Sequence, residues 1–240
     1  MPSVVLLAGG VATRLRPITE TIPKALLTVA GEPFIAHQLL LLQKNGIKKV
    51  VICSGYLSNQ IEGFVGDGSR FGLSVTFSVD GEKLLGTGGA IKKALPLLGE
   101  EFFVLYGDSY LTVNFKHVYE SFLTSSTSLG LMTVFKNLNA WDNSNIVFEG
   151  GQIVVYDKKN KIKGMDYIDY GLGILKKRAF DKMADRDVFD LSEIYQGIIS
   201  KKLMCGYEAP ERFYEIGSLS GLAETEQYIL TTKKQEIGNE

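Results

Sequence analysis

The hydrophobic positions of this chain form short apolar runs that alternate with longer segments of helical period. Compact runs rich in Val, Ile, Leu and Phe predict buried strands. Segments whose apolar residues recur every three or four positions, as Ile35, Leu39 and Leu42 do, predict helices with one buried face. Strand and helix alternate through the first half of the chain, which predicts an α/β fold built on a parallel sheet.

The expected elements can be placed by residue number. The pattern predicts strands at residues 4–8, 48–53, 73–79, 102–106, 129–135 and 167–175. It predicts helices at residues 33–45, 61–65, 114–122, 190–199 and 219–230, and one that ends near residue 97. In the less regular second half, Glu149-Gly150-Gly151 predicts a hairpin between 146–148 and 152–156, and residues 213–218 end a further strand.

The first strand leads into a turn that suits a polyphosphate. Gly9 and Gly10 end the strand, and Thr13, Arg14 and Lys24 follow. Glycines accept positive φ and let a ligand approach the main chain closely. Turn N–H groups can form an anion nest, and the cations can neutralise phosphate charge. The alternative is an ordinary strand-to-helix turn with surface cations.

Two later segments carry similar chemistry. Gly86, Thr87 and Gly88 precede a helix, where glycines and the helix N-terminus suit a polar or anionic ligand. Asp108 follows Gly107 just past an apolar strand, a suitable place for a metal ligand at a sheet edge. A plain helix entry and a plain turn are the respective alternatives. The P-loop pattern and the G-x-G-x-x-G pattern are both absent from the first turn.

The first turn reads G-G-x-x-T-R-L-x-P and then P-K. This resembles the signature of the sugar-1-phosphate nucleotidylyltransferases, which include bacterial heptose- and mannose-1-phosphate guanylyltransferases and short N-acetylmuramate-1-phosphate uridylyltransferases. The chain departs from the signature at Ala12, usually Gly, and at Ala25, usually Pro. The resemblance implies a Rossmann-like mixed, mostly parallel sheet flanked by helices. It also implies one nucleotidyltransferase domain, with a nucleotide-binding half at about 1–112 and a sugar-phosphate-binding half at about 113–240.

The resemblance implies a reaction in which a nucleoside triphosphate and a sugar 1-phosphate give an NDP-sugar and pyrophosphate for cell-surface glycan synthesis, with Mg²⁺ as cofactor. It implies that Arg14, Lys24 and Asp108 are catalytic. The residues implied to bind the nucleotide are Leu7, Ala8, Gly9, Gly10, Thr13, Gly86, Thr87, Gly88 and Gly107.

Three further segments match the family in part. Asp157-Lys158-Lys159 stands where relatives have E-K-P, so Lys158 is expected to hold the sugar phosphate, with Lys159 or a solvated charge run as alternatives. Tyr170 and Gly171 fall where relatives have N-x-G, whose Asn binds sugar hydroxyls; a packed strand is the alternative. Glu215 stands where relatives have a metal-binding Asp, so Asp108 and Glu215 are the expected Mg²⁺ ligands.

The base is a separate prediction. Asp80 and Glu82 precede the Leu85–Ala90 loop that the resemblance places against the base. A carboxylate can accept both the N1–H and the N2 amino group of guanine, which favours GTP. The alternatives are a UTP-dependent uridylyltransferase, a CTP-dependent cytidylyltransferase for a phospho-alcohol, and a catalytically silent nucleotide-binding relative with a regulatory role.

Composition narrows the partners. The 26 basic and 27 acidic residues give a net charge of −1, without the basic excess of a nucleic-acid-binding protein. The longest apolar runs are too short for a membrane span. Cys53 and Cys205 are expected as buried free thiols, which suits a reducing cytoplasm. His37 and His117 lack metal-ligand spacing. A homodimer is retained as one expected assembly.

Overall fold

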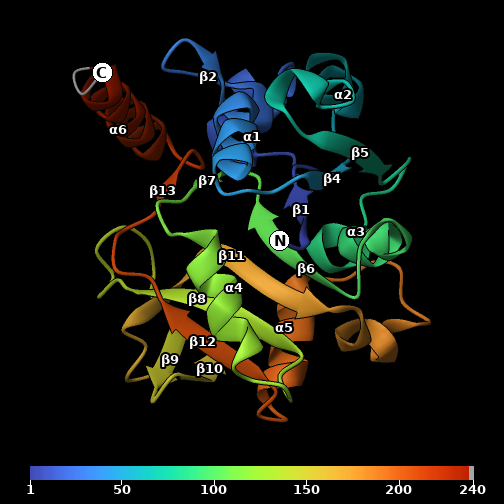
Figure 1. Cartoon of the computed structure of the whole chain (residues 1–240), viewed down its shortest axis with the longest axis vertical. Coiled ribbons are helices and arrows are strands. Elements are labelled where there is room, and N and C mark those ends of the chain that lie inside the picture. The colour runs from blue at the N-terminus through green and yellow to red at the C-terminus, as the bar shows by residue number, and fades with distance from the viewer. Residues whose placement is uncertain (238–240) are drawn as a thin grey trace.

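A computed structural model describes residues 1–237, in which the main sheet crosses the whole molecule (Figure 1). Its nine strands lie in the order β5 (Ser74–Val79), β4 (Lys49–Ser54), β1 (Ser3–Leu7), β6 (Glu101–Tyr106), β11 (Tyr167–Lys176), β8 (Gly130–Lys136), β12 (Met204–Glu208), β10 (Gln152–Tyr156) and β9 (Ile146–Glu149).

The directions of the strands divide the sheet. Strands β5, β4, β1 and β6 are parallel to one another. Strand β11 runs antiparallel to both of its neighbours, β6 and β8, and β12 is parallel to β8. The predicted hairpin β9–β10 closes the far edge in antiparallel pairing. The expected mixed, mostly parallel sheet is therefore confirmed.

Helices cover both faces of the sheet because side chains alternate along each strand. In β1, Val4 and Leu6 face the core under α1, α2 and α4, whereas Val5 faces the core under α3 and α5. These five helices have the bounds α1 (Phe34–Lys44), α2 (Ser58–Val65), α3 (Gly86–Ala94), α4 (Phe115–Leu123) and α5 (Leu191–Ile199). All five were predicted, although α3 begins at Gly86, within the segment expected to precede it.

Two small ribbons and the last helix complete the fold. The ribbons are β2 (Thr28–Val29) with β3 (Glu32–Pro33), and β7 (Ser109–Tyr110) with β13 (Tyr214–Glu215). Helix α6 (Leu219–Ile237) packs beside β2 and β13 at the end of the molecule away from β9 and β10 (Figure 1). The strand expected at 213–218 is only the two-residue β13, and the strand β12 was not predicted.

Within residues 1–237, no helix combines the length and the apolar character needed to cross a membrane.

Candidate active site

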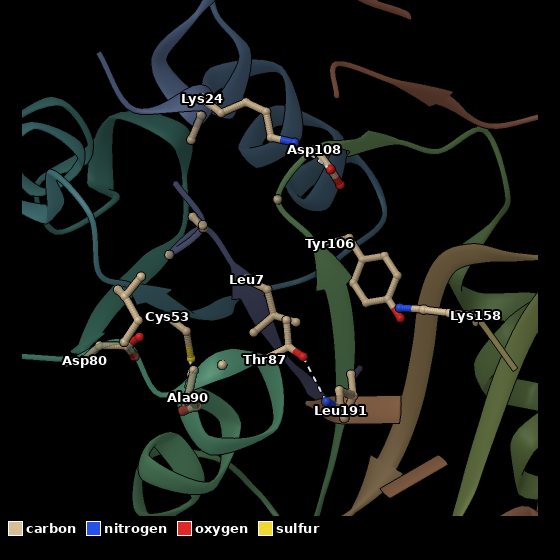
Figure 2. Close-up of a pocket in the computed structure, with 17 residues that line it drawn as sticks. Leu7, Lys24, Cys53, Asp80, Thr87, Ala90, Tyr106, Asp108, Lys158 and Leu191 are labelled. Atoms are coloured by element: carbon tan, nitrogen blue, oxygen red, sulfur yellow. Dashed lines mark hydrogen bonds and ion pairs between the residues drawn. The ribbon is translucent and has the colours of Figure 1, made fainter. Parts of the chain in front are cut away.

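A cavity of about 330 Å³ opens where β1, β4, β5 and β6 end (Figure 2). These are the carboxyl ends of parallel strands, where α/β sheets place their ligands. The predicted site residues that line the cavity are Leu7, Ala8, Gly9, Gly10, Lys24, Gly86, Thr87, Gly107, Asp108 and Lys158. Thr13, Arg14, Gly88, Tyr170, Gly171 and Glu215 were predicted but are not among its lining residues.

The first turn differs from its prediction in where the backbone takes positive φ. Neither Gly9 nor Gly10 has positive φ, whereas Ala12 does, at +46°. A methyl group at Gly9 would lie 3.3 Å from the amide nitrogen of Gly55, so this glycine allows close packing of two chain segments. At Gly10 it would meet nothing within 4 Å. The glycine usual in the family at position 12 is explained by the left-handed conformation that Ala12 adopts here.

Lys24 and Asp108 form an ion pair at the mouth of the cavity. Lys24 begins the 3₁₀ turn Lys24–Leu26, and its Nζ lies 2.7 Å from Asp108 Oδ2. Asp108 follows β6 because Gly107 lets the chain pass close to Leu7, whose carbonyl accepts the Gly107 N–H at 3.0 Å. The pair therefore links the first turn to the end of β6.

Arg14 and Glu215 lie beside this pair, around Gly217. A methyl group at Gly217 would lie 3.1 Å from Arg14 Nη2 and 3.6 Å from Lys24 Nζ. The backbone N–H of Gly217 donates to Glu215 Oε2, and the Ser218 hydroxyl donates to Oε1 at 2.9 Å. Two cations and a carboxylate thus converge on one point next to the cavity.

Backbone pairing brings Asp108 and Glu215, the two expected metal ligands, into neighbouring positions. Glu215 pairs with Ser109 in the β7–β13 ribbon, and the Ile216 N–H donates to the Asp108 carbonyl at 3.0 Å. The part of the chain that the structure describes holds no cluster of three or more metal-ligating side chains. Two carboxylates nevertheless fit Mg²⁺, which usually takes one or two carboxylates together with waters and substrate phosphates.

The start of α3 is closed by another part of the chain, which corrects the prediction for Gly88. The N–H groups of Gly88 and Gly89 both donate to the carbonyl of Phe189, at 3.0 and 3.2 Å. The Phe189 ring packs directly against Gly88, and a methyl group at Gly86 would lie 2.6 Å from the Phe189 carbonyl oxygen. These glycines therefore accommodate the segment before α5, and Gly88 is not open to a nucleotide.

Thr87 lines the cavity, but its hydroxyl is engaged with α5. It donates to Asp190 Oδ2 at 3.1 Å. It also accepts the Leu191 N–H at 2.8 Å, as Figure 2 shows. Asp190 caps α5 by accepting from Ser192 N–H. The threonine hydroxyl thus links α3 to the start of α5. Only the methyl group and the backbone of Thr87 remain available to contact a ligand.

Asp80 lines the cavity at the end of β5, whereas Glu82 is exposed and does not line it. Asp80 Oδ2 accepts the Leu85 N–H at 3.0 Å. Asp80 Oδ1 is buried and has no hydrogen-bond partner among the described residues. Burial raises the pKa of this carboxyl above its ordinary value. Because Oδ1 has almost no exposed surface, a ligand in the cavity would reach it only if the Asp80 side chain turned.

Lys158 lies beside Tyr106, on the side of the cavity opposite Asp80 (Figure 2). Lys159 is exposed outside the cavity, and its backbone N–H donates to Asp157. Of the two lysines weighed from the sequence, Lys158 is therefore the one positioned to meet a ligand.

The structure does not support Tyr170 as a sugar contact. Its side chain is buried, packs edge-on against Phe213, and exchanges a 3.0 Å hydrogen bond with the Thr112 hydroxyl. Gly171 is also buried, with φ +97°, and a methyl group there would lie 2.8 Å from Ser109 Oγ. The strand alternative holds for both residues.

Asp169 and Tyr106 are polar residues near the site that the sequence reasoning passed over. The Tyr106 hydroxyl donates to Asp169 Oδ2 at 2.6 Å. The spacing N-x-G contained the signal for Asp169, because this residue stands two positions before Gly171, where the family has Asn. The other lining residues not predicted are Ala25, Cys53, Leu84 and Leu191, whereas Ala90 belongs to the loop expected against the base.

Comparison with known proteins identifies the family to which this chain belongs. Residues 3–228 match the family model described as nucleotidyl transferase. The chain belongs to the nucleotidyl transferase family. This nucleotidyl transferase is 29% identical to the N-acetylmuramate alpha-1-phosphate uridylyltransferase of Neisseria meningitidis serogroup B, over 92% of this chain and 95% of the relative. It is 30% identical to the D-glycero-alpha-D-manno-heptose 1-phosphate guanylyltransferase of Campylobacter jejuni, over 80% and 84% of the two chains.

Solved structures share the fold of this nucleotidyl transferase. HddC from Yersinia pseudotuberculosis, solved in complex with GMP-PN, superposes with a TM-score of 0.78 at 24% identity, over 95% of this chain and all of HddC. A Bacillus anthracis protein solved with sucrose superposes with a TM-score of 0.83 at 20% identity, over 94% of each chain. At these identities the likeness establishes the architecture alone.

Proposed function

We propose that this nucleotidyl transferase moves a nucleotidyl group from a nucleoside triphosphate to a sugar 1-phosphate, giving an NDP-sugar and pyrophosphate. The observation that carries the proposal is the cavity in which the Gly9-Gly10 turn faces the Lys24–Asp108 pair. Two relatives that align with most of the chain are named for transfer to sugar 1-phosphates.

The reaction needs no covalent enzyme intermediate. An oxygen of the acceptor phosphate attacks the α-phosphorus, the bond from that phosphorus to the bridging oxygen of the β-phosphate breaks, and pyrophosphate leaves. Catalysis then consists of positioning and charge neutralisation. We assign Lys24 to the α-phosphate, Arg14 to the departing β- and γ-phosphates, and Lys158 to the acceptor phosphate.

A divalent cation completes the proposed charge balance. We assign Asp108 and Glu215 to Mg²⁺, because they are the carboxylates that flank Lys24 and Arg14. When bound, Mg²⁺ would supply positive charge to the phosphate oxygens. The two buried free thiols, Cys53 and Cys205, support the expectation that the enzyme works in a reducing cytoplasm.

The base preference that the site supports best is guanine. Asp80 lines the cavity, and its carboxylate accepts a single hydrogen bond among the described residues, so a turn of the side chain would present two acceptors to a base. Guanine presents two adjacent donors to such a carboxylate, and charge-assisted hydrogen bonds are the stronger kind. Glu82 is dropped from this role, because it is exposed and outside the cavity. UTP is the second candidate, favoured by the uridylyltransferase that aligns with 92% of the chain.

A substrate matrix tests the proposal. GTP, UTP, CTP and dTTP would each be combined with mannose 1-phosphate, a heptose 1-phosphate, N-acetylmuramate 1-phosphate and phosphocholine, in the presence of Mg²⁺, and pyrophosphate release would be measured. Highest kcat/KM with GTP and a sugar 1-phosphate supports the full proposal. Better use of UTP overturns the base, and activity with CTP and phosphocholine alone overturns the acceptor. Nucleotide binding without turnover would identify a silent relative.

A further inference from the structure

The Lys158 ammonium rests against two aromatic rings. Its Nζ lies 5.6 Å from the centroid of the Tyr106 ring and 5.6 Å from that of the Tyr156 ring. Both distances fall within the range in which an ammonium is attracted to the face of an aromatic ring. Figure 2 shows the lysine reaching toward Tyr106 at the side of the cavity. The two tyrosines come from different strands, β6 and β10.

One carboxylate accepts a hydrogen bond from each of the two tyrosines. The hydroxyls of Tyr106 and Tyr156 donate to the same oxygen of Asp169, Oδ2, at 2.6 and 3.3 Å. The Gly171 N–H donates to the other oxygen at 3.1 Å, which fixes the carboxylate on β11. Burial, together with the Asp169 charge, raises the pKa of each tyrosine well above its ordinary value, so both hydroxyls remain donors at neutral pH.

No carboxylate of the described residues contacts the Lys158 ammonium, although its charge interacts with that of Asp190 from beyond ion-pair distance. Among residues 1–237 it forms no ion pair, and the neighbouring Asp157 is engaged by its own turn, accepting from Lys159 N–H at 2.7 Å and from the Asn160 side chain at 3.0 Å. Lys24, by contrast, is paired with Asp108. A cation held over neutral rings keeps its charge available for an incoming anion, because no ion pair has to be broken first.

We propose that Asp169, acting through Tyr106 and Tyr156, positions Lys158 to receive the phosphate of the acceptor. Asp169, Tyr106 and Tyr156 are then positioning residues, and Lys158 is the group that touches the substrate. The identity of that anion rests on the proposed function. The position of the Lys158 ammonium against the two tyrosine rings, here called the lysine seat, does not.

The lysine seat is tested by NMR, in a measurement that needs no enzymatic reaction. Lysines would be reductively methylated with ¹³C, and the Lys158 resonance would be assigned by its loss in Lys158→Arg. Ring currents should move this resonance upfield of the Lys159 resonance. Tyr106→Leu and Tyr156→Leu should return it to the position of Lys159, and Asp169→Asn should shift it in the same direction while disturbing packing least. A Lys158 resonance that coincides with that of Lys159 in the wild type, or that none of the three variants moves, would overturn the proposal.

Inorganic phosphate serves as the probe of anion binding. Titration at constant ionic strength should move the Lys158 resonance, and its midpoint should rise by about twofold to fivefold in Tyr106→Leu and Tyr156→Leu, the change expected when a cation–π contact is lost. A phosphate midpoint unchanged in both variants would contradict the positioning role. This measurement requires neither nucleotide nor sugar. It can therefore show that the tyrosines do not position Lys158 even if the proposed reaction is correct, and the reverse.

The link to catalysis is tested by a double-mutant cycle. Tyr156→Leu should raise KM for the sugar 1-phosphate that the wild type uses, leave KM for the nucleotide unchanged, and have no further effect in a Lys158→Met background. Lys159→Met is the matched control and should leave both KM values unchanged. Additive effects of the Tyr156 and Lys158 substitutions would show that the tyrosine acts independently of the lysine and would overturn the proposal.

Discussion

Lys24 Nζ lies 2.7 Å from Asp108 Oδ2, so the cation assigned to the α-phosphate is paired with a carboxylate assigned to the metal. The side chains are 18% and 31% exposed, respectively. A nucleotide that draws Lys24 onto its phosphate would leave Asp108 free to meet a divalent cation. If the proposed assignments hold, the pair would couple nucleotide binding to metal binding.

The first prediction concerns metal binding by the nucleotide-free protein. Lys24→Met removes the competing charge, so Mn²⁺ should bind more tightly by about threefold or more, since a partly exposed pair contributes up to ~1 kcal/mol. Titration followed by electron paramagnetic resonance measures this directly. Lys116→Met, which removes the exposed pair with Glu120 on α4, is the control. Unchanged or weaker Mn²⁺ binding in Lys24→Met would show that the pair does not compete with a metal.

Asp108→Asn should abolish turnover and leave the protein folded. The amide keeps the shape of the side chain but loses the charge that a hard cation requires. Pyrophosphate release with Mg²⁺ gives the activity, and circular dichroism with a thermal melt gives the fold. Asp181→Asn, at an exposed position that does not line the cavity, should behave as the wild type. Wild-type turnover by Asp108→Asn would remove this residue from the metal site.

Asp80→Asn should weaken GTP use and stabilise the free protein. An asparagine offers guanine one acceptor in place of two, so kcat/KM for GTP should fall by about tenfold, or ~1.4 kcal/mol. Burial raises the pKa of Asp80 above the ordinary 3.8, so its charged form costs stability in the folded state. That cost is full above the folded pKa and disappears as pH falls below the ordinary value.

The melting temperature of Asp80→Asn should therefore exceed that of the wild type at pH 7.5, and the gap should close toward pH 4. Thermal melts at the two pH values measure this. Glu82→Gln is the matched control and should change neither GTP use nor the melting temperature. A GTP preference that survives in Asp80→Asn would reject the carboxylate as the guanine reader.

Two glycine substitutions on different helices should have opposite effects on stability. A methyl group at Gly89 in α3 would lie 3.1 Å from the Asp187 carbonyl carbon and collide with its oxygen, so Gly89→Ala should destabilise the fold by about 1–3 kcal/mol. Gly63 in α2 is exposed and meets nothing within 4 Å. Gly63→Ala should stabilise by about 0.5–1 kcal/mol. Urea denaturation measures both, and tolerance of Gly89→Ala would mean that the segment before α5 does not close α3.

Much of the fold could be predicted because its strands and helix caps carry local signals. The apolar runs of β1, β4 and β6 identify buried strands, and Asn114, at the start of the helix predicted from residue 114, caps α4. Strand β12 was missed because Gly206 interrupts its apolar run; the lack of a side chain at this position makes room for the Phe148 ring. The glycine is thus explained by Phe148, which is distant in the sequence and which the local pattern around Gly206 does not reveal.

The site was predictable where a motif brings its own geometry and not where distant segments meet. The Gly9-Gly10 turn, Lys24 and Asp108 lie together as their motifs indicated. The glycine-rich start of α3 also looked like a ligand site, yet its N–H groups bind the carbonyl of Phe189, about a hundred residues later. Tyr170 faces the core, a direction that the sequence pattern around Gly171 does not reveal.

The most direct test of the central claim is the product balance of the full reaction. The enzyme would be incubated with Mg²⁺, GTP and the sugar 1-phosphate that gives the highest rate, and the products would be quantified by ³¹P NMR. We predict that pyrophosphate and a GDP-sugar form in equal amounts, that omission of the sugar 1-phosphate prevents both, and that Lys24→Met slows both by more than about tenfold. Formation of GDP and inorganic phosphate, or of pyrophosphate without a nucleotide sugar, would contradict nucleotidyl transfer at this site.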